Sequence, residues 1–199
     1  MWLFKKDMYQ YNLFERVKID FIKEQQNSKV KVEKVCDNDK YIFYKYTPDD
    51  VLHYTYIVGQ LKKNPKKIYY FGQNFEYVCE FKESLFLCNN SGEINRPQTF
   101  IHRLDLNNKT EECYNLRGDY SRMIFINGYC RAYSTDHYID MKIENEELVI
   151  YGQREKGDNK NQDDVYNCDM NFKIVFRIEN NNFVPYFITA EKEFRFYKN

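Results

Sequence analysis

Hydrophobic and polar positions alternate with a period of two over most of the chain, in short runs that turn residues interrupt. Runs of this kind predict β-strands that turn one face toward a core. The order of elements also repeats: a strand, a polar loop, a second strand, a tight turn and a third strand. The first runs of four such units begin at Tyr41, Leu85, Tyr129 and Phe172, which are 44, 44 and 43 residues apart. The pattern therefore predicts an all-β fold of repeated hairpins.

A period of about forty residues is the size of one blade of a β-propeller. We expect a small propeller-like array of about four antiparallel blades, with a β-sandwich or a distorted barrel as the alternative, because those folds use as many short strands. The expected strands are Tyr41–Tyr46, Leu52–Val58 and Ile68–Phe71; then Phe75–Phe81, Leu85–Cys88, Phe100–Leu106 and Glu112–Leu116; then Met123–Ile126, Tyr129–Tyr133, Tyr138–Ile143 and Leu148–Tyr151; and finally Phe172–Ile178, Phe183–Thr189 and Phe194–Tyr197.

The N-terminal segment precedes these units. Residues 1–16 carry apolar side chains three or four positions apart, which predicts a short helix or arm. From Val17 the period changes to two, and we expect a strand Val17–Ile22 that pairs beside Phe194–Tyr197 and closes the ring, since closure removes sheet edges. At 199 residues, the chain is expected to form a single domain.

The stretch from Phe75 to Tyr151 resembles β-propeller blade repeats at the level of pattern. Its clearest part is an apolar strand that ends in Leu104-Asp105-Leu106, a short polar turn, and Thr110-Glu111-Glu112 at the start of the next strand. The resemblance implies an outer hairpin of a blade. In such a hairpin the Asp105 carboxylate accepts hydrogen bonds from the backbone of the turn.

The same stretch supports a second hypothesis. His102-Arg103-Leu104-Asp105 resembles a signature of one pseudouridine synthase family, which would make Asp105 catalytic. That signature continues with Thr-Ser-Gly, whereas positions 108–110 here are Asn-Lys-Thr. Enzymes of that family also need a basic surface for RNA, so the structural role of Asp105 is the favoured interpretation.

Charge and composition narrow the class of partner. Lysine and arginine total 30, as do aspartate and glutamate, so the chain has no net field that would attract nucleic acid or an acidic membrane. The chain reaches charged residues after only four apolar positions, and no run approaches the length of a membrane helix. We expect a soluble, cytoplasmic protein. The abundance of tyrosine can reflect the base composition of a genome, so it is not taken as evidence of a binding surface.

The sequence contains few candidates for catalytic or metal-binding residues. The six cysteines stand alone within or beside apolar runs, which predicts free, mostly buried thiols, and the three histidines are too scattered for a metal site. No motif indicates a metal or a cofactor. The alternative function, a hydrolase or an RNA-directed enzyme, would use His137 and Asp136, which we place in a loop spanning residues 134–137.

The favoured function is a non-enzymatic binding or interaction module with a protein partner. In a propeller, the loops between the second and third strands of each blade and the loops between blades emerge on one face, and loops on a rigid scaffold concentrate binding residues. The residues expected to share that face are Asp49, Asp50, Glu93, Arg96, Arg117, Asp119, Asp136, His137 and Asn181.

Overall fold

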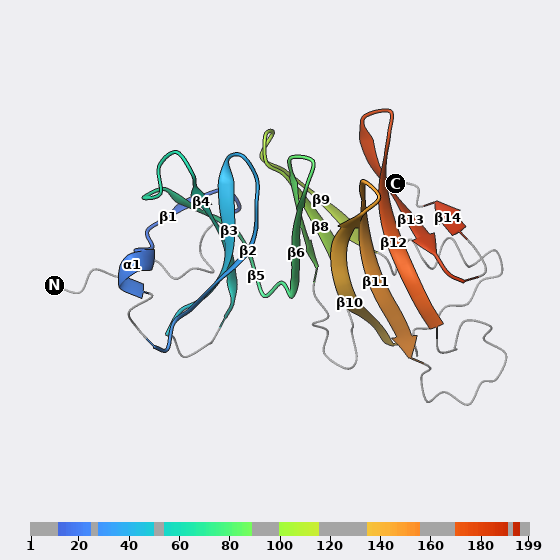
Figure 1. Cartoon of the computed structure of the whole chain (residues 1–199), viewed down its shortest axis with the longest axis horizontal. Coiled ribbons are helices and arrows are strands. Elements are labelled where there is room, and N and C mark those ends of the chain that lie inside the picture. The colour runs from blue at the N-terminus through green and yellow to red at the C-terminus, as the bar shows by residue number, and fades with distance from the viewer. Residues whose placement is uncertain are drawn as a thin grey trace. The chain divides into compact units, whose positions relative to one another are not determined.

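The structure is a computed structural model that describes residues 12–24, 28–49, 54–88, 100–115, 135–155, 170–190 and 193–195. Over these residues the chain is all-β, which confirms the fold class predicted from the alternation. Strands form three antiparallel sheets, and the single described helix, α1 (Phe21–Glu24), has four residues (Figure 1). No described helix has the length and apolar character needed to cross a membrane.

Within the chain, two compact units can be distinguished. The first comprises Met1–Leu87 and Arg103–Glu111, and the second comprises Cys88–His102 and Glu112–Asn199. Compact units of one chain need not be separate domains, so the expected single domain stays a prediction.

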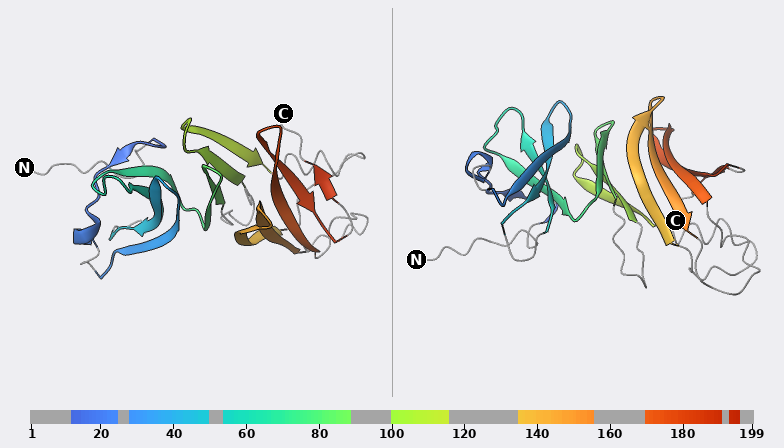
Figure 2. Two further views of the ribbon diagram at one scale, coloured as in Figure 1. Left: turned by 45° about the horizontal axis from the view of Figure 1, so that its top comes forward. Right: turned by 60° about the horizontal axis from the view of Figure 1, so that its bottom comes forward.

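The first sheet is a meander of consecutive strands with one added strand at its edge (Figure 2). Its order is β1-β5-β4-β3-β2, so that the strands from β2 to β5 are neighbours in chain order and β1 pairs with β5. The strands are β1 (Arg16–Val17), β2 (Lys31–Asp37), β3 (Tyr41–Thr47), β4 (Tyr56–Leu61) and β5 (Ile68–Gln73).

Strand β1 corrects the predicted ring closure. Val17 pairs with Ile68, and its side chain is only 1% exposed within the core of the first sheet. The backbone continues this pairing outside the strand, because Tyr70 N donates to Glu15 O at 2.9 Å. The predicted strand Val17–Ile22 ends at Val17 and gives way to α1, so it does not pair beside Phe194–Tyr197. Residues 12–16 are also not helical, and Met1–Tyr11 lie outside the described residues.

The second sheet contains the four strands predicted for the second unit, with ends within two residues of the prediction. Its strands are β6 (Tyr77–Phe81), β7 (Ser84–Cys88), β8 (Phe100–Asp105) and β9 (Thr110–Asn115), in the order β6-β7-β8-β9. The β6–β7 turn has two residues, Lys82 and Glu83, both with positive φ. A two-residue turn with positive φ matches the twist of the strands that it joins.

The third sheet corrects the number of repeated units. It contains β10 (Thr135–Glu144), β11 (Glu147–Glu155), β12 (Met170–Glu179), β13 (Asn182–Ile188) and β14 (Glu193–Arg195), in chain order. Strands β11 and β12 pair with each other although residues 156–169 separate them in the chain. Strands that were predicted to belong to separate third and fourth blades therefore belong to one sheet. The strands predicted at Met123–Ile126 and Tyr129–Tyr133 lie outside the described residues. Across those that are described, three sheets replace four blades.

The core of the first unit lies on both faces of the first sheet. One face buries Val17, Tyr56, Val58 and Ile68, among others. The other face packs on apolar residues of β7 and the β8–β9 hairpin, and its centre is an edge-to-face pair of Phe43 and Phe71 with ring centroids 5.2 Å apart. Each fully buried side chain of this size contributes about 1.5–3 kcal/mol. The first sheet is therefore held from both sides.

Candidate binding surface

The predicted binding face falls partly within the described residues. Asp50, Glu93, Arg96, Arg117 and Asp119 lie outside them. Asp49 follows the end of β3 in the first unit, while Asn181 occupies the β12–β13 turn in the second. Asp49 lies 3.8 Å from Lys29 Nζ in an exposed ion pair, and such pairs contribute little to stability.

Asp136 and His137 are not in a loop, which corrects the prediction. Both belong to β10, where Asp136 pairs with Arg154 and His137 with Gln153 of β11. Arg154 in turn pairs with Met170, the first residue of β12. Asn181 lies two residues beyond Glu179, the other end of β12, and Glu179 is nine residues and about 30 Å of extended strand away from Met170. The structure therefore does not bring Asn181 together with Asp136 and His137.

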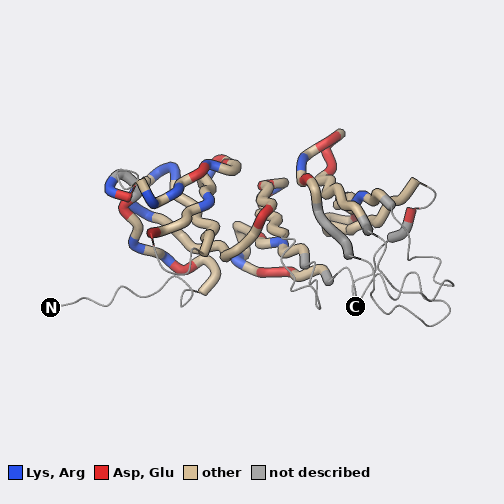
Figure 3. Tube along the Cα trace, turned by 90° about the horizontal axis from the view of Figure 1, so that it is seen from below, with Lys and Arg blue, Asp and Glu red and all other residues tan. Residues whose placement is uncertain are grey.

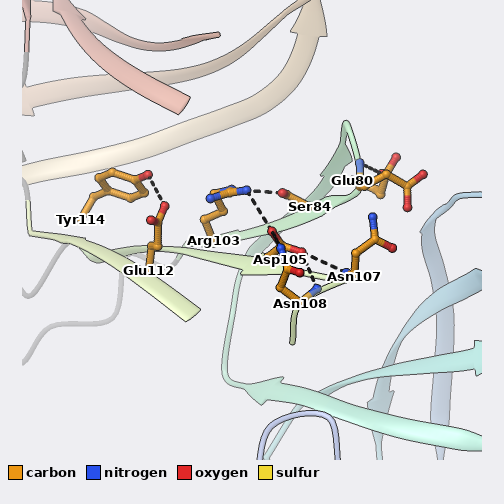
Figure 4. Close-up of polar contacts among 9 residues, drawn as sticks. Glu80, Ser84, Arg103, Asp105, Asn107, Asn108, Glu112 and Tyr114 are labelled. Atoms are coloured by element: carbon orange, nitrogen blue, oxygen red, sulfur yellow. Dashed lines mark hydrogen bonds and ion pairs between the residues drawn. The ribbon is translucent and has the colours of Figure 1, made fainter. Parts of the chain in front are cut away.

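The role of Asp105 is visible in the β8–β9 turn (Figure 4). Its Oδ1 accepts hydrogen bonds from the backbone N–H groups of Asn107 at 3.0 Å and Asn108 at 2.8 Å, and its Oδ2 accepts one from Asn108 Nδ2 at 3.1 Å. Burial alone would raise the pKa of Asp105, but the hydrogen bonds from Asn108 and Asn107 outweigh it and the pKa is lowered. The structural role implied by the blade-like hairpin is confirmed, and this geometry gives no support to a catalytic one.

Two neighbouring side chains, Arg103 and Tyr114, make further polar contacts in this hairpin. Arg103 donates from Nε to the buried Ser84 Oγ at 3.0 Å and places Nη2 3.5 Å from Asp105 Oδ2, as Figure 4 shows. Further along β9, the Tyr114 hydroxyl donates to Glu112 Oε2 at 2.9 Å, and its ring packs edge-to-face on Phe176 at 5.1 Å. These contacts stabilise the hairpin and fix β9 against β12.

The described cysteines divide by exposure. Cys88 is buried, as predicted, and Cys36 and Cys79 are half-buried. Cys113 is exposed, whereas the sequence predicted mostly buried thiols. Cys130 and Cys168 lie outside the described residues. Burial, followed by the proximity of Cys79, raises the pKa of the Cys36 thiol to about 12, and burial raises that of Cys79 to about 11. Such thiols stay protonated at neutral pH and are poor nucleophiles. In the described part of the chain, no three metal-ligating side chains are grouped for a metal ion.

The most developed arrangement of polar side chains covers one side of the third sheet. Successive side chains of a strand point to opposite faces, and the register therefore separates an apolar face from a polar one. The apolar face carries Leu148, Ile150, Phe172, Ile174, Phe176 and Phe187. The polar face carries Asp140, Lys142, Glu144, Glu147, Tyr151, Lys173, Arg177, Glu179, Tyr186 and Glu193.

Tyr151 is the centre of one half of the polar face. The Nζ atoms of Lys142 and Lys173 lie 4.8 and 5.3 Å from its ring centroid. Its hydroxyl donates to Glu144 Oε2 at 2.5 Å, and Lys142 Nζ lies 3.1 Å from Glu144 Oε1. The hydrogen bond to Glu144 raises the pKa of Tyr151, while that bond and Lys142 lower the pKa of Glu144. The ring is thus held between two cations, and its hydroxyl is bound to a carboxylate.

Tyr186 is the centre of the other half. The guanidinium carbon of Arg177 lies 4.5 Å from its ring centroid, and its hydroxyl donates to Glu179. Arg177 donates from Nε to Glu147 Oε1 at 2.9 Å and from Nη1 to Glu193 Oε1 at 2.7 Å. The hydrogen bond to Glu193 raises the pKa of Arg177 most, and the hydrogen bond to Glu147 raises it further. This arginine therefore links β11, β12 and β14 while it covers a tyrosine of β13.

Beneath these long side chains lie Val149 and Val175, which are each 4% exposed although they point to the polar face. Long charged side chains can cover apolar surface with their methylene stems while their heads stay in water. The polar face is consequently an ordered layer of aromatic rings, cations and carboxylates over a small apolar base. Tyrosine and arginine are enriched in the same way at the centres of protein interfaces.

No motif in the sequence marks this surface. The available clue was that Lys142 and Glu144, and likewise Lys173 and Arg177, are an even number of residues apart and therefore lie on one face of a strand. This spacing does not show which residues of different strands contact each other, because the contacts arise from the pairing of β11 with β12, which residues 156–169 separate in the chain. Composition could not single out Tyr151 and Tyr186, since the chain contains 19 tyrosines.

Comparison with protein families, with curated proteins and with solved structures gives no match to this chain.

Proposed function

We propose that the protein is a non-enzymatic interaction module that binds a protein partner through the polar face of its third sheet. The observation that carries the proposal is the ordered set of Tyr151, Tyr186 and Arg177, whose ring and guanidinium contacts hold them in place. Side chains that are ordered before binding lose less conformational entropy when a partner arrives. Tyrosine and arginine are also the side chains that most often dominate interface energetics.

The charge of the surface favours a protein over a polyanion. On the polar face, Lys142 and Arg177 form ion pairs with neighbouring carboxylates, and Lys173 lies over the ring of Tyr151. Basic and acidic residues are also interspersed along the traces of both units (Figure 3), and their totals over the chain are equal, at 30 each. Nucleic-acid binding draws its affinity from unpaired basic charge, and interspersed charges of both signs suit a partner that is itself mixed.

For the architecture, we propose blade-like units. This is supported by the topology, because β2 to β5, β6 to β9 and β10 to β13 are each four antiparallel strands in chain order, the arrangement of a propeller blade. Binding by the loop residues Asp49, Asp50, Glu93, Arg96, Arg117 and Asp119 stays a prediction, as does a cytoplasmic location. No observation on the described residues favours the enzymatic alternative with His137 and Asp136.

The experiment compares capture of partners by three forms of the protein. The test variant is Lys173→Glu with Arg177→Glu, which reverses two charges at the centre of the polar face. The control is Lys66→Glu, an exposed charge reversal in the β4–β5 turn of the first unit. Each form is incubated with lysate of the source organism, bound proteins are identified by mass spectrometry, and a candidate common to wild type and control is purified for calorimetric titration.

We expect the purified candidate to bind the wild type and the Lys66→Glu form equally and the polar-face variant at least about tenfold more weakly, since central interface residues commonly contribute 2 kcal/mol or more. Thermal unfolding checks that the variant is folded, and Lys173→Glu alone replaces it if Arg177→Glu unfolds the sheet. Equal affinity of all folded forms would show that this face is not the binding surface.

A further inference from the structure

Strand β10 forms an edge of the third sheet. The sheet begins with β10 and ends with the three-residue β14, and among the described strands only β11 pairs with β10. An edge strand presents unpaired N–H and C=O groups in a row and can add a strand from another chain. At ten residues, β10 is long enough to do so.

Two apolar side chains on this edge are largely exposed: Ile139 and Ile143 are 55% and 51% exposed. Ile178, which is 43% exposed, lies on the interior strand β12 and not on this edge. The edge strand β2 of the first sheet carries charged side chains at Lys31, Glu33, Lys34 and Asp37, a common protection against pairing. Strand β10 carries charge as well, at Asp140, Lys142 and Glu144. The two edges differ in that β10 alone of these two strands adds isoleucines that are more than half exposed to water.

The sequence of the exposed segment is complementary to itself. Residues 139–143 are Ile-Asp-Met-Lys-Ile. In an antiparallel pair centred on Met141, Ile139 of one copy lies opposite Ile143 of the other, and Asp140 lies opposite Lys142. Both pairs then occur twice, as two-fold symmetry requires. Opposite charges and apolar pairs directly across two antiparallel strands stabilise their pairing.

The geometry of the strand suits this register. The irregularity in β10 falls at Ile139, the first residue of the segment, which the register with β11 skips between Tyr138 and Asp140, while residues 140–144 pair regularly with β11. Lys142 Nζ already lies 3.4 Å from Asp140 Oδ2 and 3.1 Å from Glu144 Oε1 on the same strand. These side chains are about half exposed, so a second strand can reach them.

We propose that two copies of this chain associate through β10, in antiparallel register about Met141, to form one continuous ten-stranded sheet. The partner is a second copy because an antiparallel copy of the same segment places lysine opposite Asp140 and aspartate opposite Lys142 at once. The association buries Ile139 and Ile143 along the edge of the sheet. It goes beyond the proposed partner-binding function, and it shares Asp140 and Lys142 with the polar face.

The test is a charge exchange followed by mass measurement. Light scattering after size-exclusion chromatography should give a concentration-dependent mass near twice 24.4 kDa for the wild type. Asp140→Lys places lysine opposite Lys142, and Lys142→Asp places aspartate opposite Asp140. Each change creates two like-charge pairs, so each variant alone should dissociate at roughly tenfold higher concentration or more.

Mixing the two variants supplies the decisive result. Asp140→Lys pairs correctly with Lys142→Asp, so the mixture should form a heterodimer with nearly the wild-type dissociation constant. Ile143→Lys should also weaken the dimer, whereas Ile178→Lys, which changes the exposed isoleucine away from the edge, should not. Far-UV circular dichroism confirms that each variant is folded.

Three results would overturn the proposal. The first is a wild-type mass of one chain at every concentration up to the solubility limit. The second is a dimer that Asp140→Lys, Lys142→Asp and Ile143→Lys leave unchanged, which would place the interface elsewhere. The third is a mixture of the two charge variants that dissociates as easily as either alone, which would exclude the register about Met141.

Discussion

At the scale of single residues, the β8–β9 turn shows how one side chain fixes a local structure. Asp105 accepts backbone hydrogen bonds from Asn107 and Asn108, while Lys109, with a φ of 56°, completes the reversal by donating its N–H to Asp105 O at 2.9 Å. Aspartate favours turns because its short side chain can satisfy such donors. The carboxylate thus substitutes for backbone acceptors that the turn cannot supply.

Asp105→Ala should lower the free energy of unfolding by about 1–2 kcal/mol, because the turn loses a charged acceptor for two backbone donors. Urea unfolding followed by circular dichroism measures the change. The matched control is Asp49→Ala, whose exposed ion pair predicts a change of at most about 0.5 kcal/mol. Equal destabilisation by both changes would contradict the special role of Asp105.

The pH dependence of the same turn follows from the lowered pKa. A carboxyl with a folded-state pKa below its ordinary value of 3.8 stabilises the protein fully above that value, and the stabilisation is lost as the pH falls through the folded-state pKa. The difference in stability between wild type and Asp105→Asn should therefore be constant from pH 7 to pH 5 and shrink below pH 3.8. A difference that grows on acidification would be the opposite of this expectation.

At the scale of elements, tight turns and one close approach determine how the strands of the third sheet meet. The β10–β11 and β12–β13 turns each contain two residues with positive φ, Asn145-Glu146 and Asn180-Asn181. Asparagine tolerates this conformation better than most residues. On the apolar face, Gly152 leaves room for the ring of Phe172, which stacks on Phe187 with centroids 5.0 Å apart. Position 152 therefore has no space for a side chain.

Gly152→Ala should destabilise the third sheet by about 1–3 kcal/mol, because a Cβ there would lie 2.1 Å from Cζ of the buried Phe172. Adding Phe172→Leu should recover part of the loss, so that the double variant is more stable than the sum of the single changes predicts. Chemical unfolding of all four forms gives the coupling energy. The control Gln153→Ala, at the exposed neighbouring position, should leave the stability nearly unchanged. Strictly additive effects of Gly152→Ala and Phe172→Leu on the free energy of unfolding would contradict the close approach of Gly152 and Phe172.

At the scale of the whole molecule, strands make up most of the described residues, and the basic and acidic residues of the chain are equal in number. We expect a far-UV circular dichroism spectrum of a β protein, with a helical content well below the roughly one third that is usual for globular proteins. The structural basis is that α1 is the only described helix and has four residues. A helical fraction of one third or more would contradict both the alternation in the sequence and the three sheets.

Much of the local structure of this protein could be predicted from its sequence alone. Alternation and turn residues located β3, β5 and the four strands from β6 to β9 to within a few residues, and the pattern around Asp105 predicted its contacts with the turn. These features depend on the preferences of neighbouring residues, so a single sequence contains them. The same local signal failed at Thr135–His137, where polar residues typical of a loop extend a strand that β11 supports.

Which strands pair and which side chains meet depends on the folded arrangement of the sheets. Alternation shows that a segment is a strand but does not show which strand it pairs with. It therefore could not predict that β1 pairs with β5, where Val17 is buried, or that β11 pairs with β12, which residues 156–169 separate in the chain. The polar face depends on the second of these pairings, because Arg177 contacts Glu147 across it. Residues 30 positions apart in the chain came together by register, which is a property of the folded sheet.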